Sequence, residues 1–386
     1  MIRFIILPVL LAALSGCATT SLPPVTSKDF AFEDDEKRLW NRSEEEEQSI
    51  ARSGMLYQDR ELEAYLNSIA KKLQPSEAYQ RIPFHIHVLK NPYCNAFAYP
   101  NGHIYVHTGI LARMDNEAQL ASLLAHEMTH ATHRHQVREF RGMLNKSAVF
   151  ASTRSLVGGL PGIGDLTTVL GEIGTKASIN GHSRDLETEA DMVGIKLVVK
   201  AGYDPREAPK LFQHLKDEME EDEQKEPFFF GSHPRLKERS ENYNDFLEEL
   251  GSGASGVTNT ETFRKKVAGT IIDNALMDFR AGRFPRTRHS AEKYLTIRPK
   301  DGRGYYLLGE IARQKGEDGD LAEAKKLFQK SVSVDPAYPD AYKGLGLLFF
   351  KEGKKSQAMK AFKSYLAKAP HAPDRSYIED YVAQCK

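Results

Sequence analysis

The chain has 386 residues, of which 40% are hydrophobic and 27% are charged, so it is long and apolar enough for two or three domains with cores. Its 53 basic residues equal its 53 acidic ones, which argues against a general nucleic-acid-binding protein, and its three cysteines are too few for a disulfide-stapled scaffold. The charge is unevenly distributed, because residues 263–386 hold 25 Lys and Arg against 15 Asp and Glu. The sequence therefore indicates an acidic N-terminal part and a basic C-terminal part.

The N-terminus is typical of a secreted protein, because residues 1–16 hold one Arg, an apolar stretch too short to span a bilayer, and then small residues. The last of these residues and the next form Leu14-Ser15-Gly16-Cys17, which resembles the lipobox of bacterial lipoproteins. The resemblance implies that Cys17 is lipidated and that residues 17–40 tether the protein to the periplasmic side of the outer membrane. The alternative is an ordinary signal peptide in which the cysteine occurs by chance.

Two segments have a backbone pattern that the sequence makes recognisable. Residues 95–107 predict a β-hairpin, because Asn101-Gly102 between two β-prone stretches is a strong hairpin signal. The edge of this hairpin could bind an extended polypeptide as an added strand, or the hairpin could simply pack against a helix. Residues 156–174 hold six glycines in an apolar stretch, which is typical of a mobile lid, although a buried hairpin is the alternative.

Residues 116–140 predict one buried helix, because they contain no Pro or Gly and their apolar residues recur at helical spacing. His126 and His130 are four residues apart and lie on one helix face, where both imidazoles can bind one metal ion, with Glu127 beside them. A catalytic zinc site needs three protein ligands and one open position. The chain lacks the further Gly and His that the metzincin motif places after this pair, so the third ligand must come from elsewhere.

A second predicted helix carries Glu187 and Asp191, which are four residues apart on one face. One of these carboxylates can bind zinc while the other accepts a proton from a ligand imidazole, although an ordinary charged helix face is the alternative. We interpret Glu189 as a solvated or structural carboxylate. His133 and His135, on the first helix, are interpreted as neighbours of the ligands or as solvated side chains.

These residues together resemble metallopeptidase family 48, the gluzincins that include the HtpX heat-shock protease and the CAAX prenyl endopeptidases. The resemblance covers residues 43–249 and rests on ordered motifs at 95–106, 126–130, 183–191 and 232–239. It implies a peptidase in which zinc activates a water molecule, a glutamate takes the proton, and a His and an Arg face the developing oxyanion. The implied residues are the zinc ligands His126, His130 and Glu187, the general base Glu127, Asp191 behind a ligand imidazole, and the oxyanion pair His233 and Arg239.

The basic part of the chain follows a glycine-rich linker at residues 251–256 and repeats every 34 residues. An Ala-x-x-x-Phe pattern and a proline recur at this interval, at Ala324, Phe328, Pro336, Ala358, Phe362 and Pro370. The pattern resembles the tetratricopeptide repeat, with a degenerate unit at 263–299 and a capping helix at 374–384. A stack of such repeats has a concave face, and its basic charge favours an anionic partner, unless the lysines only make the outer faces soluble.

We therefore predict an α+β, mostly helical fold. A gluzincin zinc-peptidase domain with a small edge sheet is expected at residues 41–250, a flexible linker at 251–262, and an all-α tetratricopeptide-repeat solenoid at 263–386. This order of domains resembles that of a periplasmic member of the family.

The predicted function is that of a zinc-dependent metalloendopeptidase of the bacterial envelope, with one Zn²⁺ per chain, which cleaves misfolded or stalled outer-membrane or periplasmic proteins. The alternative is a chaperone or scaffold for outer-membrane protein assembly with a latent protease site. The predicted partners are unfolded or misassembled polypeptides, the outer-membrane assembly machinery through the repeats, and the membrane through the lipid anchor, with no nucleic acid. Cys94 and Cys385 could form a disulfide between the two parts or remain two separate thiols.

Overall fold

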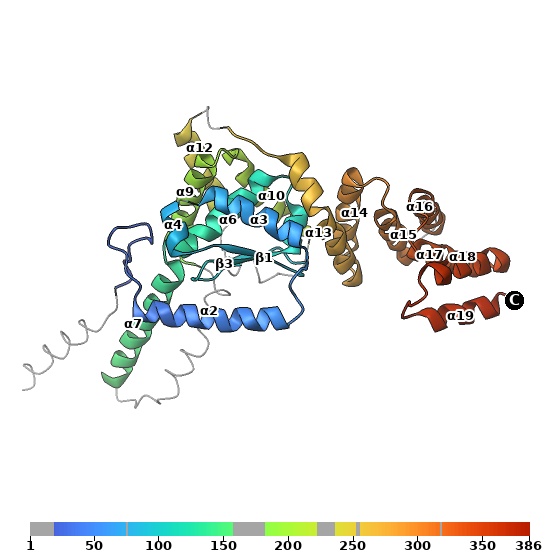
Figure 1. Cartoon of the computed structure of the whole chain (residues 1–386), viewed down its shortest axis with the longest axis horizontal. Coiled ribbons are helices and arrows are strands. Elements are labelled where there is room, and N and C mark those ends of the chain that lie inside the picture. The colour runs from blue at the N-terminus through green and yellow to red at the C-terminus, as the bar shows by residue number, and fades with distance from the viewer. Residues whose placement is uncertain (1–18, 75, 157–181, 222–235, 252–254, 317–318) are drawn as a thin grey trace, which may run out of the picture. The chain divides into compact units, whose positions relative to one another are not determined.

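The computed structural model describes residues 19–74, 76–156, 182–221, 236–251, 255–316 and 319–386 (Figure 1). The chain divides into two compact units, which we call unit 1 and unit 2. Unit 1 comprises the chain up to Ile110 together with Met114–Thr260, and unit 2 comprises Leu111–Arg113 together with Glu261–Lys386. Cys17, His233 and most of the segment expected as a lid lie outside the described residues.

Unit 1 is mostly helical and contains one small sheet, as predicted. Its helices are α2 (Asp34–Arg52), α3 (Arg60–Leu73), α4 (Ser76–Arg81), α5 (Thr108–Arg113, whose last three residues belong to unit 2), α6 (Glu117–Thr132), α7 (His135–Leu156), α9 (Arg184–Lys200), α10 (Ala208–Glu221) and α12 (Leu236–Leu250). Its strands are β1 (His85–Leu89), β2 (Ala96–Ala98) and β3 (His103–His107). Among the described residues, no helix combines the length and the apolar character that a bilayer-spanning helix needs.

The three strands are arranged in the order β1-β3-β2, with β1 parallel and β2 antiparallel to β3. The predicted hairpin is confirmed, because β2 and β3 pair directly and are joined at Asn101-Gly102. Gly102 has φ 94°, and a Cβ atom there would lie 2.5 Å from the backbone oxygen of Pro83, so the turn needs glycine. Strand β2 therefore forms one edge of the sheet.

Helix α6 lies in the core of unit 1, and all 16 of its residues are buried. It begins after Asn116, whose side chain accepts a hydrogen bond from the backbone N–H of Gln119 and so caps the helix. Helix α9 packs closely against it at Gly194, where a Cβ atom would lie 3.3 Å from the backbone nitrogen of His126. Glu187 and Asp191 precede Gly194 by seven and three residues, so this contact turns both carboxylates toward the His126 end of α6.

The prediction of one continuous helix over residues 116–140 is wrong. Helix α6 ends at Thr132, and α7 begins at His135, because Arg134 between them has a left-handed backbone with φ 60°. No local sequence feature marks this break, since Arg ordinarily favours helices and no glycine or proline is present. The buried side chain of Arg134 instead pairs with Glu36 of α2, 98 residues away, and this tertiary contact accompanies the turn.

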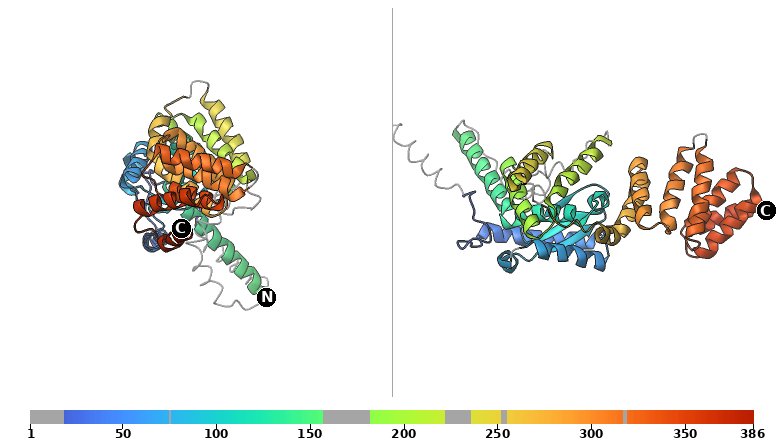
Figure 2. Two further views of the ribbon diagram at one scale, coloured as in Figure 1. Left: turned by 90° about the vertical axis from the view of Figure 1, so that its right-hand side faces the viewer. Right: turned by 90° about the horizontal axis from the view of Figure 1, so that it is seen from above.

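Unit 2 is helical. Its helices are α13 (Thr260–Arg280, which begins at the last residue of unit 1), α14 (Phe284–Ile297), α15 (Gly302–Lys315), α16 (Asp320–Val334), α17 (Asp340–Lys351), α18 (Lys355–Lys368) and α19 (Arg375–Gln384). From α14 onward, which Figure 2 shows in orange and red, each helix packs against the next. The repeating aromatic residues Phe328 and Phe362 are fully buried, as the repeat pattern predicts. Glycines let the neighbouring helices approach these rings, since a Cβ at Gly346 would lie 2.5 Å from the ring of Phe362.

Cys94 lies buried in unit 1 and Cys385 lies buried in unit 2.

Candidate metal centre

The structure brings His126 and His130 of α6 together with Glu187 of α9, and all three side chains are buried. The Nε2 atoms of the two histidines lie 3.0 Å apart. The Glu187 carboxylate completes the triangle, with Oε2 3.5 Å from His126 Nε2 and Oε1 3.4 Å from His130 Nε2. The fold therefore places three ligand atoms around one point, although Glu187 follows His130 by 57 residues in the sequence.

This donor set fits a zinc ion. Two tetrahedral zinc ligands with bonds of about 2.0–2.1 Å lie about 3.3 Å from each other, and the three observed separations fall between 3.0 and 3.5 Å. Two imidazole nitrogens and one carboxylate oxygen are also the ligands of a common type of catalytic zinc site, which keeps its fourth position open. The geometry therefore agrees with the ligands that the sequence predicts, and the metal itself remains a prediction.

Asp191 lies where a proton acceptor for a ligand imidazole is expected, because its Oδ1 is 2.9 Å from His126 Nδ1. A proton held at Nδ1 leaves the lone pair of Nε2 free for a metal ion. Burial and the guanidinium of Arg239 lower the pKa of His126, but the carboxylates of Asp191 and Glu187 outweigh both and raise it to about 9. At neutral pH the metal-free His126 is therefore an imidazolium, and a metal ion would take the place of the proton on Nε2 while the proton on Nδ1 stays with Asp191.

His130 is oriented by a different chain of contacts, which ends at Glu189. Its Nδ1 lies 2.8 Å from His135 Nδ1, and His135 Nε2 lies 3.4 Å from Glu189 Oε2. Arg138 donates a further hydrogen bond of 2.7 Å to Glu189, and these two partners lower the pKa of Glu189 to about 2. His135 is therefore a buried neighbour of the ligand His130, and Glu189 is a structural carboxylate that contacts His135 and Arg138.

The electrostatic surroundings keep His130 neutral. Burial, followed by the nearby imidazole of His182, holds the pKa of His130 well below its usual range. The ring of His182 stacks on that of His130 with centroids 4.0 Å apart. Sequence reasoning did not single out His182, and its place just before the second predicted helix was the available signal. A neutral imidazole is the form that binds a metal ion.

Arg239 of α12 is buried and connects the two carboxylates of α9. Its Nη1 lies 3.1 Å from Glu187 Oε2, and its Nε and Nη2 donate hydrogen bonds of 2.9 and 2.8 Å to Asp191. Burial alone would raise the pKa of Asp191, but the charge and hydrogen bonds of Arg239 hold it below its usual range. Arg239 therefore positions both carboxylates, and its contact with an oxyanion stays a prediction.

Glu127 follows His126 on α6 and is 1% exposed. It does not belong to the group of three ligand atoms. A buried carboxylate beside the ligands is what a general base requires, and this role also stays a prediction.

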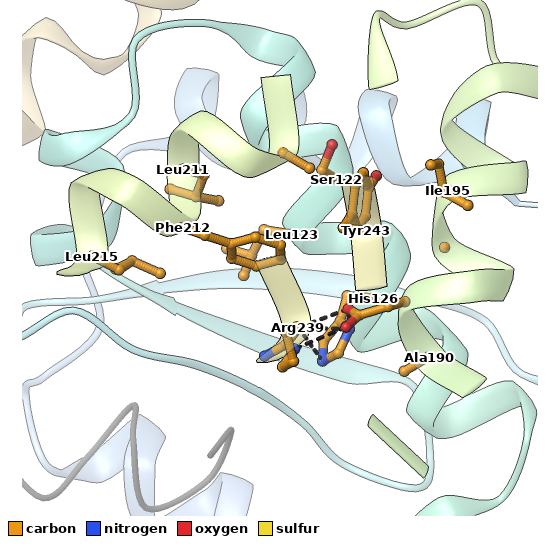
Figure 3. A pocket seen from close by; sticks show the side chains of 13 residues that line it. Ser122, Leu123, His126, Ala190, Ile195, Leu211, Phe212, Leu215, Arg239 and Tyr243 are labelled. Carbon is orange, nitrogen blue, oxygen red and sulfur yellow. Dashed lines mark hydrogen bonds and ion pairs between the residues drawn. The ribbon is translucent and has the colours of Figure 1, made fainter. Parts of the chain in front are cut away.

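A pocket borders the polar cluster, as Figure 3 shows from close by. His126, Asp191 and Arg239 form a polar part of its lining, and the guanidinium of Arg239 lies beside the His126 ring. The remaining wall is largely apolar and includes Leu123, Ile195, Leu211, Phe212 and Leu215. The pocket thus places an apolar wall beside the polar cluster, which strengthens charge interactions on that side.

Comparison with known proteins agrees with this description. The family model for peptidase family M48 matches residues 57–245, and a model for the tetratricopeptide repeat matches residues 317–378. The β-barrel assembly-enhancing protease of Escherichia coli strain K12 is 30% identical over 172 residues, which cover 43% of this chain and 35% of that protein. The mitochondrial metalloendopeptidase OMA1 of Schizosaccharomyces pombe is 30% identical over 217 residues, covering 56% of this chain and 62% of that protein.

The chain therefore matches about a third of the length of the first relative and less than two thirds of the second. The matched region contains both metal helices, and the helices of unit 2 carry the repeats. From the ligand geometry and the family matches together, we conclude that residues 57–245 are a peptidase region of family M48 and that residues 317–378, after it, carry tetratricopeptide repeats.

Proposed function

We propose that this protein is a zinc-dependent metalloendopeptidase of the bacterial envelope, with one Zn²⁺ per chain. The observation that carries the proposal is the buried triangle of His126, His130 and Glu187, beside which Glu127 supplies a further carboxylate. A purely structural zinc site has four protein ligands, whereas three protein ligands leave a position open for reaction. The three ligands and the adjacent carboxylate therefore support a hydrolytic site.

A bound zinc ion would supply Lewis acidity toward a water molecule and a peptide carbonyl. Glu127 takes the proton of the attacking water and passes it to the leaving amine. Asp191 keeps the proton of His126 at Nδ1, and Arg239 holds Asp191 and Glu187 in place. The edge of β2 offers main-chain groups to an extended substrate, although the Ala98 carbonyl already accepts a hydrogen bond from Gln136.

The proposed substrates are misfolded or stalled outer-membrane or periplasmic proteins, recruited by the repeats of unit 2. Two observations support this choice: the similarity to a protease named for β-barrel assembly, and an N-terminal sequence that resembles a secretory signal with a lipobox at Cys17. The proposed location is the periplasm, with lipidated Cys17 anchored in the outer membrane. The outer-membrane assembly machinery is a proposed partner of the repeats.

The proposal is tested with Glu127→Gln in the full chain, with Glu45→Gln, an exposed position on α2, as the control. Because Glu127 is not a ligand, the variant is expected to retain zinc while its cleavage of unfolded casein falls by about 10²–10⁴-fold. Cleavage at the wild-type rate by zinc-loaded Glu127→Gln would contradict the mechanism. Full complementation of a deletion strain by this variant would instead favour the chaperone or scaffold function, and trapping chains on it identifies the substrates.

A further inference from the structure

The turn between α6 and α7 has an unusual backbone. Arg134 has φ 60°, a left-handed conformation that residues with a side chain seldom adopt. The turn is closed by backbone hydrogen bonds from His133 to Thr129 (2.8 Å) and from Arg134 to Ala131 (3.1 Å). Something outside the turn must favour this conformation over continuation of the helix, because the local sequence favours helix.

The side chain of Arg134 makes the contacts that favour this left-handed conformation. It is 1% exposed and forms a two-bond contact with Glu36 of α2, with Nη2 2.6 Å from Oε2 and Nε 3.0 Å from Oε1. The Glu36 side chain is 2% exposed, so both charges are buried and depend on each other. Arg134 also donates hydrogen bonds to the carbonyl oxygens of Pro23 and Ala31.

The N-terminal segment contacts the same turn through its backbone. The N–H of Val25 donates a 2.8 Å hydrogen bond to the carbonyl of Thr132, the last residue of α6, and Val25 is fully buried. These contacts come from residues 23–36, which precede the region matched by the peptidase family model at 57–245. Part of the segment expected to be only a tether is therefore packed against the end of the metal helix.

The turn determines where His135 lies, because His135 is the first residue of α7. His135 Nδ1 is 2.8 Å from Nδ1 of the ligand His130. The partner of the second nitrogen of a ligand imidazole sets the orientation of its ring and its tautomer. A relaxed turn would displace His135 and leave His130 without this partner.

We propose that Glu36 and Arg134 are positioning residues of the metal centre, which act on His130 through the left-handed turn and His135. The proposal rests on the metal site of the proposed function but not on its peptidase activity. Loss of a contact behind a metal ligand typically lowers metal affinity 10–100-fold. Glu36→Gln removes the buried counter-charge of Arg134 and is expected to weaken zinc binding by at least tenfold.

The experiment measures zinc affinity of the full chain by competition with a chromogenic chelator, after the metal has been removed. Asp35→Asn is the matched control, because Asp35 also joins α2 to α7, through hydrogen bonds of 2.7 and 2.8 Å from Arg141, but does not touch the turn. It is expected to leave zinc affinity unchanged. Equal losses of affinity in both variants would show that α2 matters only for general stability and would overturn the proposal.

A double-mutant cycle tests the route through His135. If Glu36 acts through His135, Glu36→Gln adds little to the loss of zinc affinity already caused by His135→Ala. Fully additive losses, or an unchanged affinity in Glu36→Gln, would refute the proposal. If Glu36→Gln does not fold, Arg134→Lys replaces it, because lysine keeps the charge without the two-bond geometry and is expected to weaken binding in the same direction.

The zinc affinity of the wild-type chain shows whether a negative result contradicts the positioning role or the proposed metal site. Absence of zinc binding by the wild-type chain would contradict the proposed metal site itself. Tight binding by wild type together with unchanged binding by Glu36→Gln would contradict the positioning role alone.

Discussion

Replacement of Arg239 by methionine should strongly destabilise unit 1 when zinc is absent. The Arg239, Glu187 and Asp191 side chains are all 3–5% exposed, so the substitution leaves two buried carboxylates without their guanidinium partner. Breaking a buried pair in this way costs about 3–5 kcal/mol. For a unit of this size, 1 kcal/mol shifts Tm by about 2–4 °C, so the Tm of metal-free unit 1 should fall by about 6–20 °C.

Arg138→Met is the matched control, because Arg138 pairs with Glu189 at 2.7 Å but the side chains are 24% and 35% exposed. A half-exposed pair contributes about 0–1 kcal/mol, so Tm should change by no more than about 4 °C. Both variants are compared by calorimetry with chelator and then with saturating zinc. Zinc should reduce the loss of Tm in Arg239→Met, because the ion supplies positive charge beside Glu187. A loss of unfolding free energy below about 1 kcal/mol in metal-free Arg239→Met would refute this reasoning. A loss that grows when zinc is added would also refute it.

Two predictions concern unit 2. Gly346→Ala places a Cβ atom 2.5 Å from the Phe362 ring and should destabilise unit 2 by about 1–3 kcal/mol in urea unfolding, with zinc affinity unchanged; a stability equal to wild type would contradict the close packing. Although partial burial opposes ionisation, hydrogen bonds from Arg303 and Tyr294 lower the pKa of Asp301 to about 2, from an ordinary 3.8. The carboxylate therefore stabilises unit 2 fully above pH 3.8, and this contribution is lost as the pH falls toward 2. Asp301→Asn keeps an acceptor for the N-cap of α15 and should abolish this loss, which is at most about 1 kcal/mol because the pair is half-exposed; an unchanged acid profile would exclude this role.

The features that the sequence predicted correctly depend on regular spacing within one element. A separation of four residues places His126 and His130 on one helix face, and the same spacing does so for Glu187 and Asp191, wherever these helices lie in the molecule. A 34-residue period likewise predicted the buried Phe328 and Phe362. The backbone geometry of a helix is sufficient for such predictions.

The tertiary structure alone showed that Arg239 holds Asp191 and that Glu36 holds Arg134. The contact of Arg239 with Asp191 spans 48 residues, and that of Arg134 with Glu36 spans 98, so neither leaves a periodic signal in the sequence. The second contact even reverses a local preference, because it accompanies a left-handed turn where the sequence predicted a continuous helix. The helical spacing of the ligands thus follows from the sequence by itself, whereas their orientation depends on buried charges that meet only when distant helices pack together.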